Sequence, residues 1–210
     1  MGTALLRSDE PSAATLSTNQ AARRQRIVDV ALSMLDERPY ERIQVKHVAD
    51  SASVALGTLY HYFPSKEHLF GEVLVQWAET LRTTLTRRPM AGSDPASRLE
   101  DLMHRSVRAF ERKPQLAKLI TRLDVSEDPF ATDVLDRLDS ATTAVYLSAL
   151  VGMDRELALR IVRVADGVLA SALRSWSAGR MPISAVYRSL SEAVALLVPA
   201  GVDRTESPTR

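Results

Sequence analysis

Apolar side chains recur three and four residues apart along most of the chain, and no run of four to eight residues alternates cleanly between apolar and polar. Because this is the period of an α-helix, the pattern predicts an all-α fold without strands. Pro39 is expected to end the first helix, and Ser65 and Asp94 are suited to cap the starts of later ones. About nine helices are expected, over residues 19–37, 44–51, 55–62, 66–87, 95–112, 114–123, 129–150, 154–178 and 183–198.

Two of these segments, 44–51 and 55–62, are too short to be stable as isolated helices. They can persist only if their apolar side chains pack against the first helix, which predicts a compact three-helix unit. The segment 66–87 carries a long apolar stripe and is expected to connect this unit with the remaining helices. Two short helices joined by a tight turn have the organisation of a helix-turn-helix.

Composition and charge restrict the class of protein. Of the 210 residues 45% are apolar, which is enough for a sizeable core, and 27 Lys and Arg nearly balance 26 Asp and Glu. The absence of cysteine excludes disulfides, thiolate metal sites and a cysteine nucleophile. The longest apolar run, residues 193–198, is far shorter than the roughly 20 residues that span a bilayer. The first 16 residues lack the apolar core of a secretory signal, so we expect a cytoplasmic protein with no membrane partner, metal or cofactor.

The most specific signal is the sequence GTLYHYFPSKE at residues 57–67, which follows the apolar pattern of Val45, Val48 and Ala49. Over residues 26–70 the chain resembles the TetR family of transcriptional regulators. The predominantly apolar C-terminal segments add a likeness to actinobacterial members of that family that regulate steroid or lipid catabolism. The resemblance implies an N-terminal helix-turn-helix DNA-binding domain, residues 19–65, and a C-terminal helical domain, residues 66–200, that binds a small-molecule effector and dimerises. Residues 1–18 and 201–210 are expected to be a disordered arm and a polar tail.

The resemblance also implies that the second short helix lies in the major groove of a double-stranded DNA operator. Gly57 lets the backbone approach a phosphate, and short or basic side chains near it bind phosphates and fix the register of the helix. The predicted DNA-binding residues are Lys46, Leu56, Gly57, Thr58, Tyr60, His61, Tyr62 and Lys66. Packing in the core is an equal alternative for Tyr60, and exposure to solvent without a DNA contact is the alternative for His61.

Two residues depart from the usual family pattern, which has Gly where this chain has Ser53 and a capping Ser or Thr where it has Ala55. Loss of the capping hydroxyl is expected to cost about 0.5–2 kcal/mol. Residues 1–70 hold eight basic and eight acidic side chains. Binding of DNA is therefore expected to depend on a local basic face, formed by Arg23, Arg24, Arg26, Lys46 and Lys66.

The segment 154–178 has two apolar rows, which predict a helix buried on more than one side, and a third edge of small residues. Together with the last helix, this edge is expected to form a two-fold symmetric four-helix interface in a homodimer. The predicted interface residues are Gly167, Ala170, Ser171, Leu190, Val194 and Leu197.

A cavity for a hydrophobic effector is expected between the helices that begin near Pro95, Pro114, Pro129 and Asp154. The residues predicted to line it are Met103, Val107, Phe110, Leu119, Leu123, Leu138, Val145, Asp166 and Leu169. For each apolar member the alternative is plain core, because apolar stripes at helical spacing usually just pack. The Asp166 carboxylate lies on an apolar row and needs a partner, either an internal hydrogen bond or the effector.

The sequence lacks a G-x-S-x-G, H-E-x-x-H or phosphate-binding glycine motif, and its four histidines are scattered, so we do not expect an enzyme. The predicted function is a sequence-specific DNA-binding repressor that binds a palindromic operator as a dimer. A hydrophobic small molecule, such as a lipid, steroid or acyl thioester, is expected to release it. The alternative is a helical dimeric ligand-binding or interaction protein that does not bind DNA.

Overall fold

Nine α-helices and two short 3-10 helices make up the computed structural model, which describes residues 18–198. The α-helices are α1 (Thr18–Glu37), α2 (Val45–Ser51), α3 (Leu56–Tyr62), α4 (Lys66–Arg87), α5 (Pro95–Arg112), α6 (Pro114–Leu123), α7 (Pro129–Leu147), α8 (Arg155–Ser177) and α9 (Ile183–Leu197), and the 3-10 helices are η2 (Tyr40–Arg42) and η3 (Ser148–Leu150). Residues 18–198 contain no strand, so the predicted all-α fold is confirmed. The predicted arm, apart from Thr18, and the predicted polar tail lie outside the described residues. Within the described range, none of the helices combines the length and the apolar character needed to cross a bilayer.

Side-chain caps explain several of the helix starts. The Ser65 side chain accepts a hydrogen bond from the His68 backbone N–H at 2.9 Å, and Asp94 accepts one from the Ser97 N–H at 3.0 Å. Each cap satisfies one of the backbone donors that a helix leaves unpaired in its first turn. The two cap residues expected from the sequence therefore start α4 and α5.

The chain after α6 differs in one detail from the sequence prediction. A single helix was expected over residues 129–150, but α7 ends at Leu147 and η3 follows it. The Ser148 hydroxyl donates a hydrogen bond to the Val145 carbonyl at 2.5 Å, at the point where the last turn tightens into a 3-10 helix.

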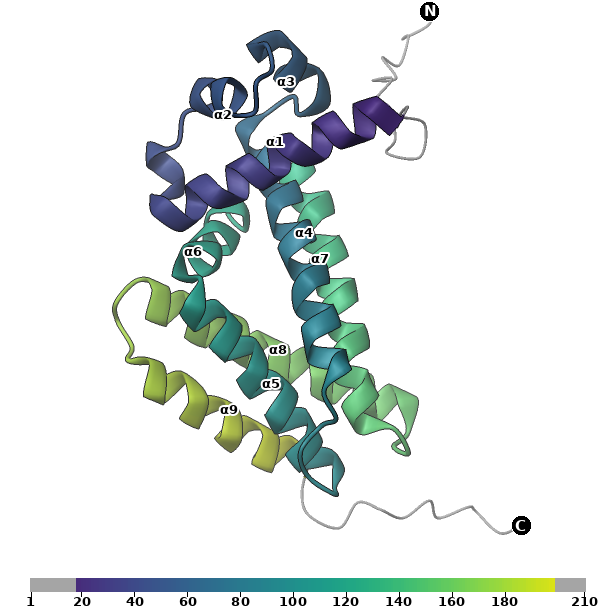
Figure 1. Cartoon of the computed structure of the whole chain (residues 1–210). Coiled ribbons are helices and arrows are strands. Elements are labelled where there is room, and N and C mark those ends of the chain that lie inside the picture. Colours follow the sequence, from purple (N-terminus) through teal and green to yellow (C-terminus); the bar gives the residue numbers. More distant parts are fainter. Residues whose placement is uncertain (1–17, 199–210) are drawn as a thin grey trace, which may run out of the picture.

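At one end of the molecule, α1, α2 and α3 form a small unit around a shared core (Figure 1). Five side chains from these helices and the residue after them have no exposed surface, namely Ile27, Ala31, Val48, Leu59 and Phe63. The two short helices thus persist by packing against α1, as expected from their length. This unit is the helix-turn-helix part of the fold.

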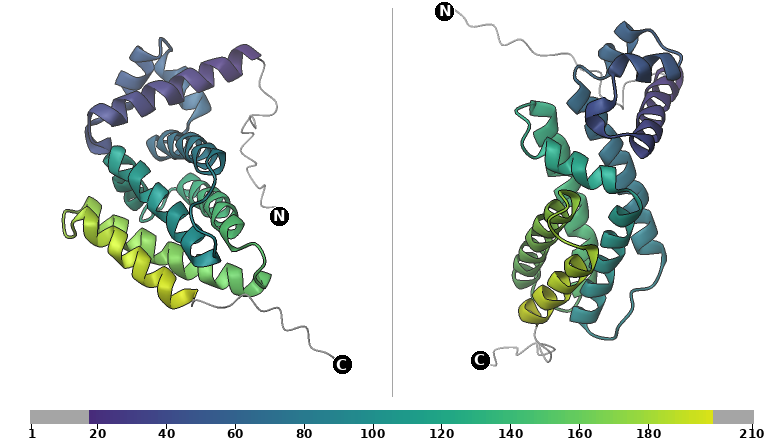
Figure 2. Two further views of the ribbon diagram at one scale, coloured as in Figure 1. Left: turned by 60° about the horizontal axis from the view of Figure 1, so that its bottom comes forward. Right: turned by 90° about the vertical axis from the view of Figure 1, so that its left-hand side faces the viewer.

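The long helix α4 leads from this unit into the rest of the chain, side by side with α7 (Figure 1). Gly71 of α4 allows this close approach, because a Cβ atom added there would lie 2.7 Å from Cγ2 of Val134 in α7. At the far end, α8 and α9 run beside each other and α5 packs against α9 (Figure 2). Helices α4 to α8 surround a space at the centre of this larger part.

Candidate nucleic-acid interface and effector cavity

The turn between α2 and α3 is made by residues 52–55. Ser53 has a φ of 55°. Within residues 18–198 it is the only residue other than glycine that has a positive φ. This left-handed conformation costs an ordinary residue about 1–2 kcal/mol, whereas glycine adopts it freely. The position at which the family usually has Gly is therefore a strained position in this chain.

The first turn of α3 has no side-chain cap. Ala55 occupies the N-cap position with extended backbone angles and offers no hydrogen-bonding side chain. The first backbone bond within the helix runs from the Leu59 N–H to the Ala55 carbonyl at 3.1 Å. The N–H groups before Leu59 therefore point out of the helix end, where an anion can accept their hydrogen bonds.

One face of α3 is exposed and the other is buried. Leu56 and Tyr60 are 39% and 45% exposed, whereas Leu59 has no exposed surface. Gly57 and His61 share the exposed face, Thr58 is half-buried, and a Cβ atom at Gly57 would meet no atom within 4 Å. The structure therefore places Tyr60 on the surface instead of in the core. Lys46 of α2 is also exposed.

Tyr62 is placed differently from the expectation of an exposed phosphate ligand. It is only 7% exposed, and its ring centroid lies 5.5 Å from that of His61 and 6.4 Å from that of Phe63. The reason is the helical period, since Leu59 and Tyr62 are three residues apart and share the inward face of α3. A DNA contact by Tyr62 stays a prediction, and only the small exposed part of its side chain could make that contact.

Lys66 is engaged within the protein and is not freely exposed. Its Nζ donates a hydrogen bond to the Tyr40 carbonyl at 2.6 Å and lies 4.0 Å from the centre of the Tyr40 ring. Burial lowers the pKa of the Lys66 ammonium. The Tyr40 hydroxyl in turn donates to Glu67 at 3.0 Å. Lys66 therefore links the start of α4 to η2. The partner, Tyr40, was not predicted from the sequence, because a single aromatic residue after a proline carries no periodic signal.

The predicted basic face is smaller than expected. Arg23, Arg26 and Lys46 are exposed, but Arg24 is turned towards the protein. Its guanidinium lies 5.0 Å from the centre of the Phe63 ring and forms an ion pair with Glu72 at 2.8 Å. The cations that remain free to attract DNA are therefore three of the five named from the sequence.

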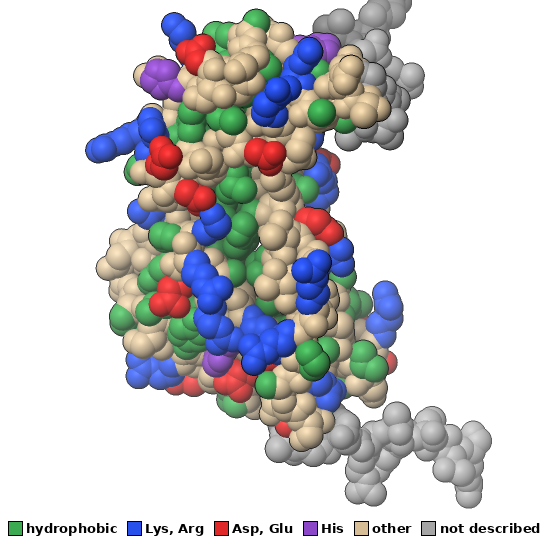
Figure 3. All heavy atoms as spheres, in the orientation of Figure 1, with side chains coloured by type: hydrophobic (Ala, Val, Ile, Leu, Met, Phe, Trp, Pro, Cys, Tyr) green, Lys and Arg blue, Asp and Glu red, His purple; other side chains and the backbone are tan. Residues whose placement is uncertain are grey.

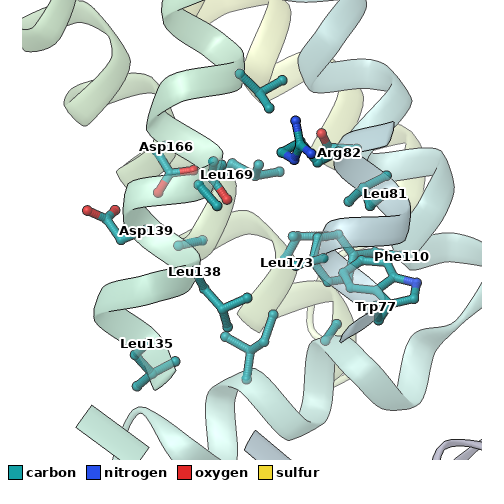
Figure 4. Close-up of a pocket in the computed structure, with 18 of the residues that line it drawn as sticks. Trp77, Leu81, Arg82, Phe110, Leu135, Leu138, Asp139, Asp166, Leu169 and Leu173 are labelled. Carbon is teal, nitrogen blue, oxygen red and sulfur yellow. The ribbon is translucent and has the colours of Figure 1, made fainter. Parts of the chain in front are cut away.

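A cavity of about 300 Å³ lies between α4, α5, α6, α7 and α8. In the close-up, Trp77 and Phe110 lie on one side and Asp139 and Asp166 on the other (Figure 4). In the space-filling view, apolar side chains are visible between α4 and the α5–α6 pair, with Lys and Arg side chains along the same face (Figure 3). The wall is mostly apolar, as in sites for small organic molecules.

The cavity contains part of the predicted lining. Five predicted residues form its wall, namely Phe110, Leu138, Val145, Asp166 and Leu169. Four others lie outside it and are buried in the core, namely Met103, Val107, Leu119 and Leu123. Helix α5, for example, packs against α9 as well as facing the cavity, and helical spacing does not distinguish the two sides. Sequence reasoning missed the contribution of α4, which includes Trp77, Leu81 and Leu85, because it treated the stripe on α4 only as a connector.

Asp166 is an ionisable group at the edge of this apolar space. Burial and, to a lesser extent, the negative charge of Asp139 raise the pKa of Asp166 to about 6. No hydrogen bond to the Asp166 carboxylate is formed within residues 18–198. The internal hydrogen bond considered from the sequence is therefore absent from the described part of the chain.

The residues predicted for the dimer interface differ in their exposure to solvent. The small residues on α8 are exposed, namely Gly167, Ala170 and Ser171, although Ala170 also lines the cavity. Leu190 and Val194 of α9 are 0% and 2% exposed, because this side of α9 packs against α5 and α8 of the same chain. The prediction that these two side chains face a partner is wrong, and Leu197 is half-buried.

Both parts of the chain match known families. Residues 27–73 match the family described as bacterial regulatory proteins, tetR family, and residues 92–197 match the tetracyclin repressor-like C-terminal domain. The HTH-type transcriptional repressor KstR of Mycobacterium tuberculosis is 34% identical over 183 residues, which are 87% of this chain and 83% of that protein. KstR of Rhodococcus jostii is 32% identical over 207 residues, covering 95% of this chain and 97% of that protein.

Solved structures agree with these matches. A TetR transcriptional regulator from Rhodococcus sp. RHA1 superposes with a TM-score of 0.75 at 27% identity, covering 87% of this chain and 98% of that one. Thermus thermophilus FadR, in complex with lauroyl-CoA, has the same fold, with a TM-score of 0.69 at 20% identity over 89% of this chain and 98% of that one. The predicted likeness to actinobacterial members of the family is thereby confirmed. The chain belongs to the TetR family of bacterial regulatory proteins and is a KstR-like DNA-binding transcriptional repressor, not an enzyme.

Proposed function

We propose that this repressor binds a palindromic operator as a homodimer, and that a hydrophobic effector in the cavity releases it from DNA. The observation that carries the proposal is the exposed face of α3, which lies at the opposite end of the molecule from α8 and α9 (Figure 1). The recognition surface and the cavity are thus separate, as a ligand-controlled DNA-binding protein requires. A cytoplasmic location is part of the same proposal, because a protein that binds an operator must share a compartment with the DNA.

On DNA, α3 occupies the major groove. Leu56, Tyr60 and His61 meet base edges or thymine methyl groups, while the uncapped N–H groups around Gly57 bind a phosphate. Lys46 of α2 reaches a flanking phosphate. Thr58, Lys66 and the exposed edge of Tyr62 add contacts beside these, with Lys66 using the N–H groups that it does not donate to Tyr40.

The homodimer forms through the exposed edge of α8 and the outer side of α9. Gly167 and Ser171 permit close approach of a partner helix, and Val164 and Leu196 offer apolar surface, being 52% and 83% exposed. A two-fold axis here pairs α8 and α9 with their copies. The two α3 helices must then lie about 34–36 Å apart to enter successive major grooves.

Effector binding is coupled to DNA binding through α7. This helix lines the cavity with Leu135 and Leu138, and between them it carries Arg137, which contacts Glu72 of α4 at 2.9 Å. Glu72 also holds Arg24 of α1. A shift of α7 around an occupied cavity therefore reaches the DNA-binding unit directly, and coupling of about 1–3 kcal/mol is typical of such systems.

A hydrophobic effector fits the mostly apolar wall, and we keep lipids, steroids and acyl thioesters as the proposed classes. The similarly folded FadR is in complex with lauroyl-CoA, which is an acyl thioester. The proposed response is release of DNA, since the curated relatives are repressors.

The proposal is tested by measuring the affinity of the purified protein for a palindrome from its own promoter region and for random duplex, at two salt concentrations. Tyr60→Ala and Lys46→Ala should each weaken palindrome binding by about five- to 100-fold, because both side chains are exposed beside the groove. Lys118→Ala, an exposed lysine on α6, is the matched control. Tyr62 and Lys66 are poor first targets because both contribute to packing. Equal affinity for palindrome and random duplex would contradict the proposal.

A further inference from the structure

One wall of the cavity carries two carboxylates that have no cationic partner within residues 18–198. The charged residues that line the cavity as a whole are Arg82, Asp124, Asp139, Asp166 and Arg174. Arg174 forms an ion pair with Asp124 at 3.4 Å, and the Arg82 Nε donates to Glu79 at 2.9 Å. These pairs leave the two carboxylates of Asp139 and Asp166 without a cation from the described part of the chain.

The two carboxylates come from different helices and lie close together. Asp139 belongs to α7 and is exposed at the edge of the cavity, while Asp166 belongs to α8 and is half-buried. Figure 4 shows both on the side of the cavity opposite Trp77. A ligand that fills the apolar space from Trp77 outward therefore meets Asp166 with its other end.

The buried hydroxyls near Asp166 have no proton to offer a ligand. The Tyr146 hydroxyl donates to the Ser106 hydroxyl at 3.0 Å, and Ser106 donates to the Leu102 carbonyl at 3.1 Å. Tyr146 and Ser106 are only 1% and 3% exposed, and both line the cavity. With both protons used inside the protein, the phenol oxygen can only accept a further hydrogen bond. Thr142, with a hydroxyl that both donates and accepts, is the exception on this part of the wall.

We infer that the effector presents a hydrogen-bond donor, either a hydroxyl or an ammonium group, to Asp166 and Asp139, and that this wall rejects ligands whose polar end is a carboxylate. The inference rests on the proposed effector role of the cavity and narrows the class of ligand. A donor on the ligand supplies the hydrogen bond that the half-buried Asp166 carboxylate lacks within residues 18–198. A carboxylate would add a third negative charge in a space of low dielectric, which is a repulsive basis for specificity.

The test uses three ligands with the same ten-carbon chain: decan-1-ol, decylamine and decanoate. Trp77 lines the cavity, so its fluorescence reports occupancy once the second tryptophan is removed in a Trp176→Phe background. At pH 7.5 we expect decan-1-ol and decylamine to bind at least about tenfold more tightly than decanoate, since a tenfold ratio needs only a small difference in interaction free energy.

Asp166→Asn should remove most of this preference, because the carboxamide is neutral and can also donate a hydrogen bond to decanoate. Asp139→Asn should act in the same direction, and it keeps the inference testable if the first variant fails to fold. Asp136→Asn is the matched control: it removes the same charge from an exposed position of α7 outside the cavity and should leave all three affinities unchanged.

The inference would be overturned by equal binding of decanoate to the Trp176→Phe protein with both aspartates intact, by an unchanged preference in both cavity variants, or by no binding of any of the three ligands. Operator binding is measured separately on the same preparations. If the palindrome is bound while the ligands show no preference, the inference about the effector fails and the DNA-binding part of the proposed function stands. If the palindrome is not bound, the proposed function fails whatever the ligands do.

Discussion

The guanidinium of Arg24 in α1 lies 2.8 Å from the carboxylate of Glu72 in α4. Arg137 of α7 contacts the other oxygen of the same carboxylate at 2.9 Å, and the Glu72 side chain is only 12% exposed. Burial alone would raise the pKa of Glu72, but the hydrogen bonds and charges of the two guanidinium groups outweigh burial and lower it. One carboxylate therefore joins the DNA-binding unit, the connecting helix and a wall of the cavity.

Glu72→Gln should destabilise the protein by about 1–3 kcal/mol at pH 7, because it removes the counter-charge of the half-buried Arg24 and leaves the exposed Arg137 with Asp133 alone, at 3.4 Å. Since the pKa of Glu72 is lowered in the folded state, its contribution is present above the unfolded pKa near 4.5 and is lost as the pH falls through the folded value. Urea denaturation at pH 7 and pH 4 should thus show a smaller difference between variant and wild type at the lower pH.

The matched control for this prediction is Glu79→Gln. Glu79 also pairs with an arginine, Arg82, but both side chains are exposed on one face of α4. Exposed pairs of this kind contribute little to stability, because water and salt screen the charges. A loss of stability at Glu79 as large as that at Glu72, or a pH-independent loss at Glu72, would show that the bridge between the three helices has no special role.

Ser53→Gly should stabilise the protein by about 0.5–1 kcal/mol, because relief of the left-handed strain exceeds the added entropy of glycine in the unfolded chain. Thermal unfolding at constant pH measures this. Ser51→Gly, at the exposed last residue of α2, is the control and should not stabilise the protein, because its backbone is not left-handed. If Ser53→Gly destabilised the protein, the φ of 55° would carry no strain.

Gly71→Ala should cost about 1–3 kcal/mol, because the new methyl group would overlap Val134 of α7 where the two helices touch. Val134→Ala in the same chain should recover part of the loss by making room for the methyl group. Chemical denaturation of both single variants and the double variant gives the coupling between the two sites. Additive losses would mean that α4 and α7 can separate without cost at this point.

The helix-turn-helix and the helix boundaries could be predicted because their determinants are local. Ser65 and Asp94 cap the helices that follow them, and the sequence around Gly57 is specific over a short span. The strain at Ser53 was also foreseeable, since the family usually has glycine there. By contrast, the inward orientation of Tyr62 and the bond from Lys66 to Tyr40 depend on how α3 and η2 pack, which local pattern does not encode.

The cavity was harder to predict than the fold because its wall gathers residues from five helices. Phe110 and Leu138 line it, but Val107, on the same helix as Phe110, is plain core. An apolar stripe on a helix predicts that its residues are buried, but it does not predict which neighbouring helix or cavity they face. Asp166 could be singled out from the sequence, since a carboxylate on an apolar row is unusual and needs a partner, but the sequence left open whether that partner is internal or an effector. The structure places Asp166 in the wall of the cavity.

Asp166→Asn should stabilise the unliganded protein near neutral pH. The raised pKa of about 6 means that the folded state favours the protonated carboxyl more than the unfolded state does, whose value is near 3.8. The folded state therefore takes up a proton between these values, and its stability falls as the pH rises from about 4 to about 6. The penalty is complete above that range and absent below it. Asparagine mimics the protonated form at every pH and escapes the penalty.

The expected gain for Asp166→Asn is about 1–2 kcal/mol at pH 7.5, allowing for the partial solvent contact of the carboxylate. At pH 4 the variant and the wild type should differ by less than about 0.5 kcal/mol. Asp136→Asn, exposed on α7, should change stability little at either pH. A gain that persists unchanged at pH 4 would mean that the substitution improves packing instead of removing a charge. A loss at pH 7.5 would mean that the Asp166 carboxylate already has a partner in the folded protein, which would also weaken the case that an effector supplies one.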